Sequence, residues 1–441
     1  MRLRFDFHCR HIAQIALVVP MLCVALTASL RGEDWPQFRG PDGQGYSRER
    51  DLPLEWSESE NVVWKTPLPG LGWSSPVVRG RLIWLTTAIE QEGSLRALCI
   101  DALTGQVLRD VEVFHKADLG PINPKNSHAS PTPVIDGDRV FVHFGAHGTA
   151  CLSLRGDVLW RNDQLAYDHR HGPGGSPVVW RDLLIFHCDG ADTQAVVALD
   201  RQTGRVRWRT DRQSQQPGYG TPLLTTVNGA DQLISPGGGM IASYEPATGR
   251  EIWRLRHGGD SVVLRPVVDH GLVYVSSGYT STALYAIDLA SRGEISTADA
   301  TWTVRRGVPF DPSPLIVGDE LYLVSDQGVV TCLDARSGKQ HWQSRLRGAF
   351  SASPLAADGR IYITSEEGVT TVIAPGKAMK KLAENTLDGR MLASLATADG
   401  AIFARTESAL YRIQSSGGPA AQHQPVAVRK KPAAASMPVA R

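Results

Sequence analysis

Histidine, asparagine and aspartate side chains gather in one part of the sequence, between residues 123 and 192, beside the glycine-rich run 172–175. The candidate binding residues in this part are Asn126, His128, His147, His169, His171 and Asp189. Imidazole and carboxylate groups bind cations, and glycine lets a backbone approach a ligand closely. The pattern therefore indicates a polar or metal-assisted ligand site.

The spacing of these histidines does not match a metal motif carried by one helix or one hairpin. Ordinary hydrogen-bonded or solvated histidines are the competing interpretation, and we predict neither a metal ligand nor a catalytic residue. No Gly-x-Ser-x-Gly segment is present, which removes support for a serine hydrolase. The glycine run 237–239 lacks the Lys-Ser/Thr pair of a phosphate-binding loop.

A repeat of 40 to 57 residues organises the chain that carries these side chains. Each unit opens on a short apolar run that follows a proline, and the openings fall at Pro76, Pro133, Pro177, Pro222, Pro266, Pro314 and Pro354. An eighth opening, at Ser394, lacks the proline. The usual length of a four-stranded propeller blade is about 40 to 50 residues. Within 314–325, two apolar runs flank a Gly-Asp turn, as in a β-hairpin.

The second half of several repeats contains a glycine turn followed four residues later by a tryptophan. These structural residues are Gly156 and Trp160, Gly204 and Trp208, Gly249 and Trp253, and Gly338 and Trp342. Glycine supplies the positive φ of a tight turn, and a large aromatic ring on an outer strand can cover the seam between two blades. Both roles are architectural.

The last repeat has only three strands, and the missing one is found near the other end of the chain. The segment 61–66, which contains Trp64, is similar to the tryptophan strand 205–210. We therefore predict an all-β fold, a single eight-bladed β-propeller of four-stranded blades, closed by the N-terminal strand. Such closure leaves no long sheet edge exposed, whereas the alternative, an open solenoid, would leave the Trp64 strand unpaired.

The two ends of the chain differ from the repeats. Residues 1–32 combine arginines with an apolar stretch, which predicts an export signal that is either cleaved or kept as a membrane anchor. Residues 33–60 form an N-terminal strap, residues 61–413 the propeller, and residues 414–441 a disordered Ala/Pro-rich basic tail. The tail is either solvated or in contact with anionic lipid or cell-wall polymer.

Charge and cysteine use narrow the function further. The net charge is +1, of which the signal carries +3 and the tail +4, so that residues 33–413 carry −6. A mildly acidic body does not attract phosphate backbones, which excludes nucleic acid as its partner. Outside the signal the cysteines are Cys99, Cys151, Cys188 and Cys332, and we expect buried free thiols that pack as small apolar residues.

The segments 198–208 and 333–342 resemble the tryptophan-docking repeat of the pyrroloquinoline quinone (PQQ) propeller superfamily. That superfamily includes quinone-dependent alcohol dehydrogenases, the BamB lipoprotein of outer-membrane assembly and many secreted bacterial propellers. The opening segment 34–41 is similar to the start of a secreted subgroup of unknown function, many of them planctomycetal. The resemblance spans residues 62–413 and specifies fold far better than function.

By this resemblance, a quinone enzyme would carry a disulfide between adjacent cysteines and a calcium ion held by carboxylate and amide groups. No two cysteines are adjacent here, so we expect no cofactor and treat PQQ with calcium as the disfavoured alternative. The sequence favours a non-enzymatic, monomeric scaffold in the periplasm or envelope, which binds a protein or glycan partner. The alternatives are a PQQ-dependent oxidoreductase and a small-ligand or metal binder at the histidine-rich mouth of blades two and three.

Overall fold

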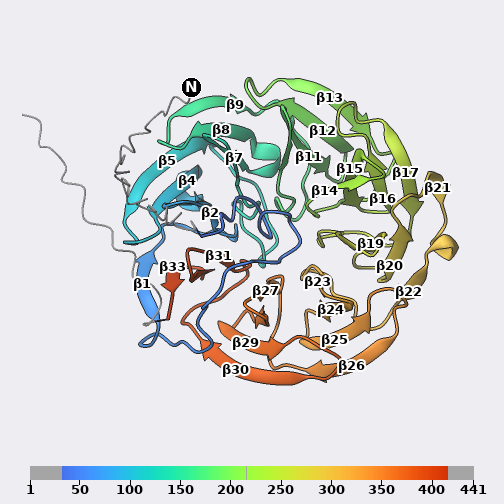
Figure 1. The fold of residues 1–441 in the computed structure, drawn as a ribbon. Coiled ribbons are helices and arrows are strands. Elements are labelled where there is room, and N and C mark those ends of the chain that lie inside the picture. Colours follow the sequence, from blue (N-terminus) through green and yellow to red (C-terminus); the bar gives the residue numbers. More distant parts are fainter. Residues whose placement is uncertain (1–31, 215, 416–441) are drawn as a thin grey trace, which may run out of the picture. The chain divides into compact units, whose positions relative to one another are not determined.

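The computed structural model describes residues 32–214 and 216–415. The predicted export signal, except for Gly32, and the tail beyond Ser415 lie outside the described residues. In the described part, 33 β-strands form eight sheets around a central axis, and the strands pair antiparallel in all but one case (Figure 1). The prediction of an eight-bladed, all-β propeller is confirmed.

In blades 1 to 7 the four strands run outward from the axis in chain order, and in blade 8 the first strand of the chain is the outermost. Blade 1 contains β2 (Val77–Arg79), β3 (Leu82–Ile89), β4 (Ser94–Asp101) and β5 (Val107–His115). Blade 2 contains β6 (Val134–Asp136), β7 (Arg139–His143), β8 (Thr149–Ser153) and β9 (Val158–Asn162). Blade 3 contains β10 (Val178–Trp180), β11 (Leu183–Asp189), β12 (Gln194–Asp200) and β13 (Val206–Asp211). Blade 4 contains β14 (Leu223–Val227), β15 (Ala230–Gly237), β16 (Met240–Tyr244) and β17 (Glu251–Arg256).

The second half of the ring repeats this arrangement. Blade 5 contains β18 (Val267–Asp269), β19 (Leu272–Ser276), β20 (Leu284–Asp288) and β22 (Trp302–Val304). Blade 6 contains β23 (Leu315–Val317), β24 (Glu320–Val324), β25 (Val329–Asp334) and β26 (Gln340–Arg345). Blade 7 contains β27 (Leu355–Ala357), β28 (Arg360–Thr364), β29 (Val369–Ala374) and β30 (Lys380–Thr386). Blade 8 contains β31 (Ala396–Ala398), β32 (Ala401–Arg405), β33 (Ala409–Ile413) and β1 (Val62–Pro67).

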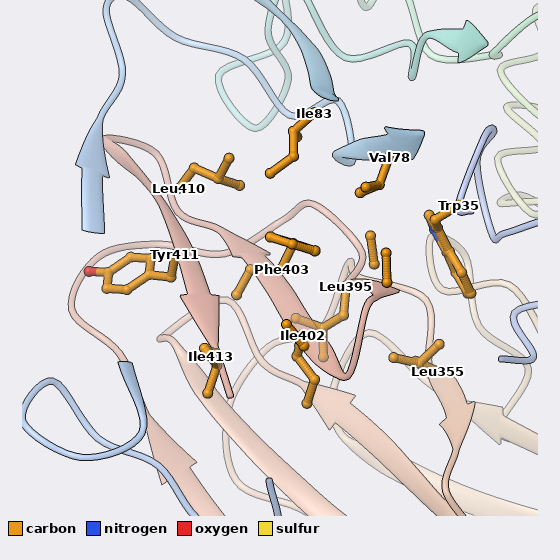
Figure 2. Close-up of a cluster of buried hydrophobic side chains, with 14 of the residues drawn as sticks. Trp35, Val78, Ile83, Leu355, Leu395, Ile402, Phe403, Leu410, Tyr411 and Ile413 are labelled. Atoms are coloured by element: carbon orange, nitrogen blue, oxygen red, sulfur yellow. The ribbon is translucent and has the colours of Figure 1, made fainter. Parts of the chain in front are cut away.

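Strand β1 closes the ring as the sequence predicts. It pairs with β33 in antiparallel register, with Trp64 opposite Arg412 and Thr66 opposite Leu410. Pairing the first strand with the last satisfies the outward-facing backbone groups of β33, which would otherwise form an exposed edge. An open solenoid is therefore excluded. Figure 2 shows the apolar packing beside this closure, where Phe403 and Leu410 of blade 8 lie near Ile83 of blade 1.

Blade 4 carries an addition that the repeat pattern does not predict. Between β20 and β22 the chain folds outward, and β21 (Gly293–Ile295) pairs in parallel with β17. The sheet of blade 4 thus has five strands, and Trp253 in β17 is completely buried. Three short 3-10 helices complete the elements, namely η1 (Glu90–Glu92), η2 (Gly145–His147) and η3 (Thr297–Asp299).

The tryptophans of the outer strands join neighbouring blades. The indole Nε1 of Trp160 donates to the carbonyl of Arg201 in the next blade at 3.0 Å, and Trp208 donates to Pro246 at 3.1 Å. Trp64 and Trp342 do the same to Ala102 and Gly376.

The turn glycines make room for these rings. A Cβ on Gly204 would lie 2.5 Å from the ring of Trp160, and a Cβ on Gly249 would lie 2.5 Å from Trp208. Each glycine therefore packs against the tryptophan of the preceding blade rather than its own. Gly338 packs in this way on Trp302, a docking tryptophan that the glycine–tryptophan spacing does not predict, whereas Gly156 faces Arg109 instead. All four predicted glycines have positive φ, as tight turns require.

The strap crosses the ring at one end of the blade strands (Figure 1). Its Asp34 accepts the N–H of Gly80, its Glu49 accepts the N–H of Gly400, and the N–H of Leu52 donates to Asp358. These partners lie in the turns between the first and second strands of blades 1, 8 and 7. Figure 1 shows this dark-blue segment crossing the ring. The loops that join one blade to the next lie at the opposite end of the strands, and we call that face the mouth.

The four cysteines of the propeller are free thiols, as predicted. Cys99, Cys151, Cys188 and Cys332 are all buried among apolar side chains. Burial raises the pKa of the Cys151 thiol to about 11, which keeps it protonated and unreactive at neutral pH. No described helix is long and apolar enough to cross a membrane.

Candidate functional site

A ring of hydroxyl groups surrounds the axis just inside the mouth. Its members, which we call the hydroxyl ring, are Ser75, Thr132, Ser176, Thr221, Ser313, Ser353 and Ser394. Each of these side chains accepts a backbone N–H from the preceding blade at 2.9 to 3.1 Å. The eighth equivalent position is Arg265, whose guanidinium turns away to Phe38 and Gln37 of the strap. The repeated Ser-Pro dipeptides thus tie neighbouring blades together around the axis.

The hydroxyl ring forms part of the wall of an axial cavity of about 700 Å³. The cavity is lined by residues from all eight connections between blades and by Phe38 of the strap. Two regions of the mouth around the cavity differ in chemistry. One is formed by the loops of blades 1 to 3 and the other by the loops of blades 5 to 7.

The region near blades 5 and 6 presents an aromatic pair. Tyr279, in the loop between β19 and β20, is 62% exposed, the largest exposed fraction of any large hydrophobic side chain in the described residues. Its ring lies 4.7 Å from that of Phe310, with 47° between the planes. The backbone N–H of Tyr279 donates to the carbonyl of Asp260, and the carboxylate of Asp326 accepts the N–H of Phe310 at 2.7 Å. Both aromatic residues are therefore fixed by a hydrogen bond of their backbone N–H as well as by the contact between their rings.

An ion-pair cluster lies beside this pair and spans the mouth. Lys125, from the connection between blades 1 and 2, reaches Asp311 at 2.8 Å and Glu366 at 2.9 Å, which lie in the loops of blades 5 to 7. Burial opposes ionisation of Glu366, yet hydrogen bonds from Ser351 and Lys125 lower its pKa. Burial and the nearby charge of Asp311 raise the pKa of Asp326 to about 6. At pH 7 the cluster holds its cation and carboxylates in mutual contact.

The region near blades 2 and 3 contains three of the predicted histidines in contact with one another. The ring centroids of His128 and His147 are 5.4 Å apart, and those of His147 and His169 are 5.2 Å apart. His128 is buried and the other two are half-buried. Burial, reinforced by neighbouring imidazoles, lowers the pKa of His147 and of His169 to about 4. These side chains are neutral at pH 7 and none of the three lines the cavity.

The remaining predicted residues are divided between cavity and core. Asn126 and His171 line the cavity. The Asn126 amide donates to the carbonyls of His171 and Pro173 and accepts the N–H of Ser127, so it holds its own loop. Asp189 is buried between blades and lies 3.0 Å from Arg212. The prediction grouped Asp189 with the mouth, but its side chain is completely enclosed.

The cysteines and carboxylates near the cavity decide whether it fits PQQ with a calcium ion. None of the four cysteines lines it. Its carboxylates are engaged, since Asp311 contacts Lys125 and Asp326 accepts two backbone N–H groups. Within residues 32–214 and 216–415, no group of three or more His, Cys, Asp or Glu side chains is placed to hold a metal ion. The residues present do not fit the adjacent-cysteine and calcium arrangement that the resemblance would require.

The sequence search did not identify Tyr279, Phe310, Lys125 or Asp311. A signal exists for the first, because Tyr279 is an aromatic residue within the polar run Ser276-Ser-Gly-Tyr-Thr-Ser281. A bulky ring in such a polar turn has few apolar side chains nearby to pack against, so it is expected to stay exposed. The ion pairs of Lys125 could not be inferred, because its partners are 186 and 241 residues away along the chain.

The sequence matches a known protein family over most of the propeller. Residues 46–190, 171–303 and 282–378 match the family described as outer membrane protein assembly factor BamB. The protein of that name from Shewanella oneidensis is 25% identical over 164 residues, which cover 35% of this chain and 39% of that protein. The dehydrogenase subunit of a quinone alcohol dehydrogenase from Gluconobacter oxydans is 24% identical over 294 residues, covering 61% and 36%. The chain spans less than half the length of these two relatives.

A solved structure shows the same fold. The crystal structure of BamB from Moraxella catarrhalis superposes with a TM-score of 0.57 over 80% of this chain and 99% of that chain. The two sequences are 13% identical over this likeness, so it shows the arrangement of blades and nothing about the ligand.

Proposed function

Since this chain belongs to the family described as outer membrane protein assembly factor BamB, we propose that it is a non-enzymatic binding propeller of the cell envelope. Its mouth is the binding face, and its partner is a protein or a glycan. The eight blades and the strap provide a rigid frame, so little conformational entropy is lost when a partner binds at the site.

One observation carries this proposal, the anchored pair at the cavity that consists of the exposed Tyr279 and the half-buried Phe310. An aromatic ring held in water is costly, and such rings are enriched at contact sites where a partner covers them. By contrast, the acidic groups nearby are engaged with Lys125 or with backbone N–H groups. The arrangement offers a contact surface and no free pair of acid and base.

The envelope location rests on two supports. The apolar, arginine-flanked start of the chain is typical of an exported protein. The family description and the Shewanella relative both name outer-membrane assembly. A membrane contact, where one exists, comes through the N-terminal segment or the basic tail, and the propeller itself acts as a monomer.

Site-specific photo-crosslinking in cells tests the proposed face. A photoreactive phenylalanine at position 279 is expected to capture a discrete envelope partner. The matched control is the same substitution at Tyr46, a 43% exposed tyrosine of the strap, on the face opposite to the mouth. Equal capture at both positions, or capture at neither, would contradict the mouth as the binding face.

We also propose that binding requires neither PQQ nor calcium. The cysteines lie away from the cavity and its carboxylates are already engaged, as described above. Purified protein supplied with PQQ and calcium is expected to show no dye-linked oxidation of alcohols. Measurable oxidation that depends on both additions would move the protein into the class of quinone enzymes.

A further inference from the structure

We propose that the axial cavity binds the end of a neutral saccharide chain, with Tyr279 and Phe310 as the stacking surface. This inference rests on the proposed function, because it names the ligand class of the same binding face. It follows from four properties of the cavity: its aromatic surface, its polar wall, its charge balance and its size.

The aromatic surface suits the C–H faces of a sugar ring. The face of an aromatic ring carries negative partial charge, and the C–H groups of a pyranose carry positive partial charge. Tyr279 and Phe310 meet at 47°, so together they form a bent surface rather than a flat one. Their backbones are fixed by Asp260 and Asp326, which reduces the entropy lost on binding.

The polar wall can satisfy many hydroxyl groups. Ten serine and threonine side chains line the cavity, together with the amides of Asn123, Asn126 and Gln327. Each member of the hydroxyl ring accepts a backbone N–H, and none donates to an acceptor within the described residues. Seven O–H donors are therefore free to turn toward a ligand. A saccharide, rich in oxygen acceptors and donors, matches this wall better than an apolar ligand does.

The charge balance disfavours strongly charged ligands. The charged side chains that line the cavity are Lys125, Asp311 and Asp326, and the first two form an ion pair of 2.8 Å. An anionic ligand would face Asp311 and Asp326, and a cationic one would face Lys125. Displacing a partly buried ion pair leaves its partners unpaired, which is costly. A neutral ligand avoids both penalties.

The size of the cavity favours a chain end over a protein surface. Ligand pockets usually enclose about 300 to 1,000 Å³, and this cavity, with its volume of about 700 Å³, lies within that range. A folded partner can cover the mouth but cannot enter a space bounded by the hydroxyl ring. The end of an extended oligosaccharide can enter it.

A glycan array followed by calorimetry tests the inference. Neutral hexose and N-acetylhexosamine oligomers are displayed beside sulfated and sialylated ones, and the full chain is applied. We expect retention on neutral oligomers, and binding of the best tetrasaccharide about tenfold weaker in Tyr279→Ala, because an aromatic contact at the centre of a site is typically a hot spot. Tyr46→Ala is the matched control and should bind as the parent does.

The outcomes separate this inference from the proposed function. Tyr279→Phe keeps the ring and is expected to bind within about twofold of the parent, which distinguishes stacking from a hydroxyl contact. Unchanged melting temperatures show that each variant is folded. If no neutral oligomer is retained while position 279 still crosslinks to a protein in cells, the saccharide inference is overturned and the binding function stands. Equal affinity of Tyr279→Ala and the parent also overturns it.

Discussion

The two sides of the mouth use exposed loops in opposite ways. On the side of blades 2 and 3, three imidazoles pack against one another and are neutral, with pKa values of about 4 for His147 and His169. On the side of blades 5 and 6, Tyr279 extends into water beside Phe310. The first side is rich in groups that could bind a metal yet uses them for packing. The second is poor in such groups yet presents the free surface.

The difference shows that residue type in a loop does not specify orientation. A histidine that loses its water becomes neutral and behaves as a polar aromatic side chain. An aromatic residue that cannot enter the core remains at the surface, held by the hydrogen bonds of its loop. Three predictions test this comparison, ordered from the largest expected effect to the smallest.

Acidification should strongly lower the free energy of unfolding, because several histidines are buried in the neutral form. Five histidines have folded pKa values lowered to about 3 or 4 by burial: His143, His147, His169, His187 and His257. The unfolded value is about 6.5, so below that pH the unfolded state binds more protons and stability falls until the folded values are reached. Asp189 and Asp326 act in the opposite direction, because their pKa values are raised to about 7 and about 6.

The five histidines outweigh the two carboxyl groups by about three protons, so about 4 kcal/mol of unfolding free energy should be lost per pH unit between pH 6 and 5, counting about 1.4 kcal/mol per proton. Urea titrations at each pH measure it. His147→Gln combined with His169→Gln should make the dependence shallower by about two protons. A stability that stays constant from pH 6.5 to 5 would show that these imidazoles are solvated.

Truncation should affect the two sides unequally. His169→Ala removes a half-buried ring that packs on His147 and Tyr167 and should cost about 1 to 2 kcal/mol. Tyr279→Ala removes a largely solvated ring and should change stability by about 0.5 kcal/mol or less. Urea midpoints at pH 7.5 give both values. A larger loss of stability for Tyr279→Ala than for His169→Ala would contradict the account, because it would mean that Tyr279 serves packing and His169 does not.

The ion pairs that join the two sides should contribute least. Lys125→Ala removes the contacts with Asp311 and Glu366, but its side chain is 42% exposed, so screening by water limits the loss to about 0.5 kcal/mol. Faster cleavage within residues 116–131 by a dilute protease should accompany it. Lys116→Ala, which breaks a partly exposed pair with Asp163, serves as the control and should leave cleavage unchanged. Identical cleavage of the two variants would mean that Lys125 does not hold its loop.

The architecture was accessible from the sequence because it is built from repeated local signals. The strand that contains Trp64 could be assigned to the last blade since it resembles 205–210 and that blade lacked an outer strand. The recurring tryptophans and glycines indicated a role at the seams, although not that each ring docks on the following blade. Strand β21 was missed because it is a single insertion that no other repeat shares.

The site was less accessible because it depends on tertiary contacts. Asp189 ends a strand and was assigned to the mouth, but Arg212, 23 residues later, draws its carboxylate into the seam between blades. His128, His147 and His169 come from three separate loops and meet only in the folded chain. Exposure of Tyr279 depends on the loop hydrogen bonds to Asp260. None of these arrangements has a spacing rule.

Hydroxyl-radical footprinting of the full chain, alone and in envelope extract, tests the central claim most directly. Residue-resolved mass spectrometry reports the oxidation rate of each side chain. We expect rapid oxidation of Tyr279 in the isolated protein, strong protection of Tyr279 in the extract, and slow oxidation of His128 in both. Protection confined to the histidines, with Tyr279 equally reactive in both samples, would contradict the account.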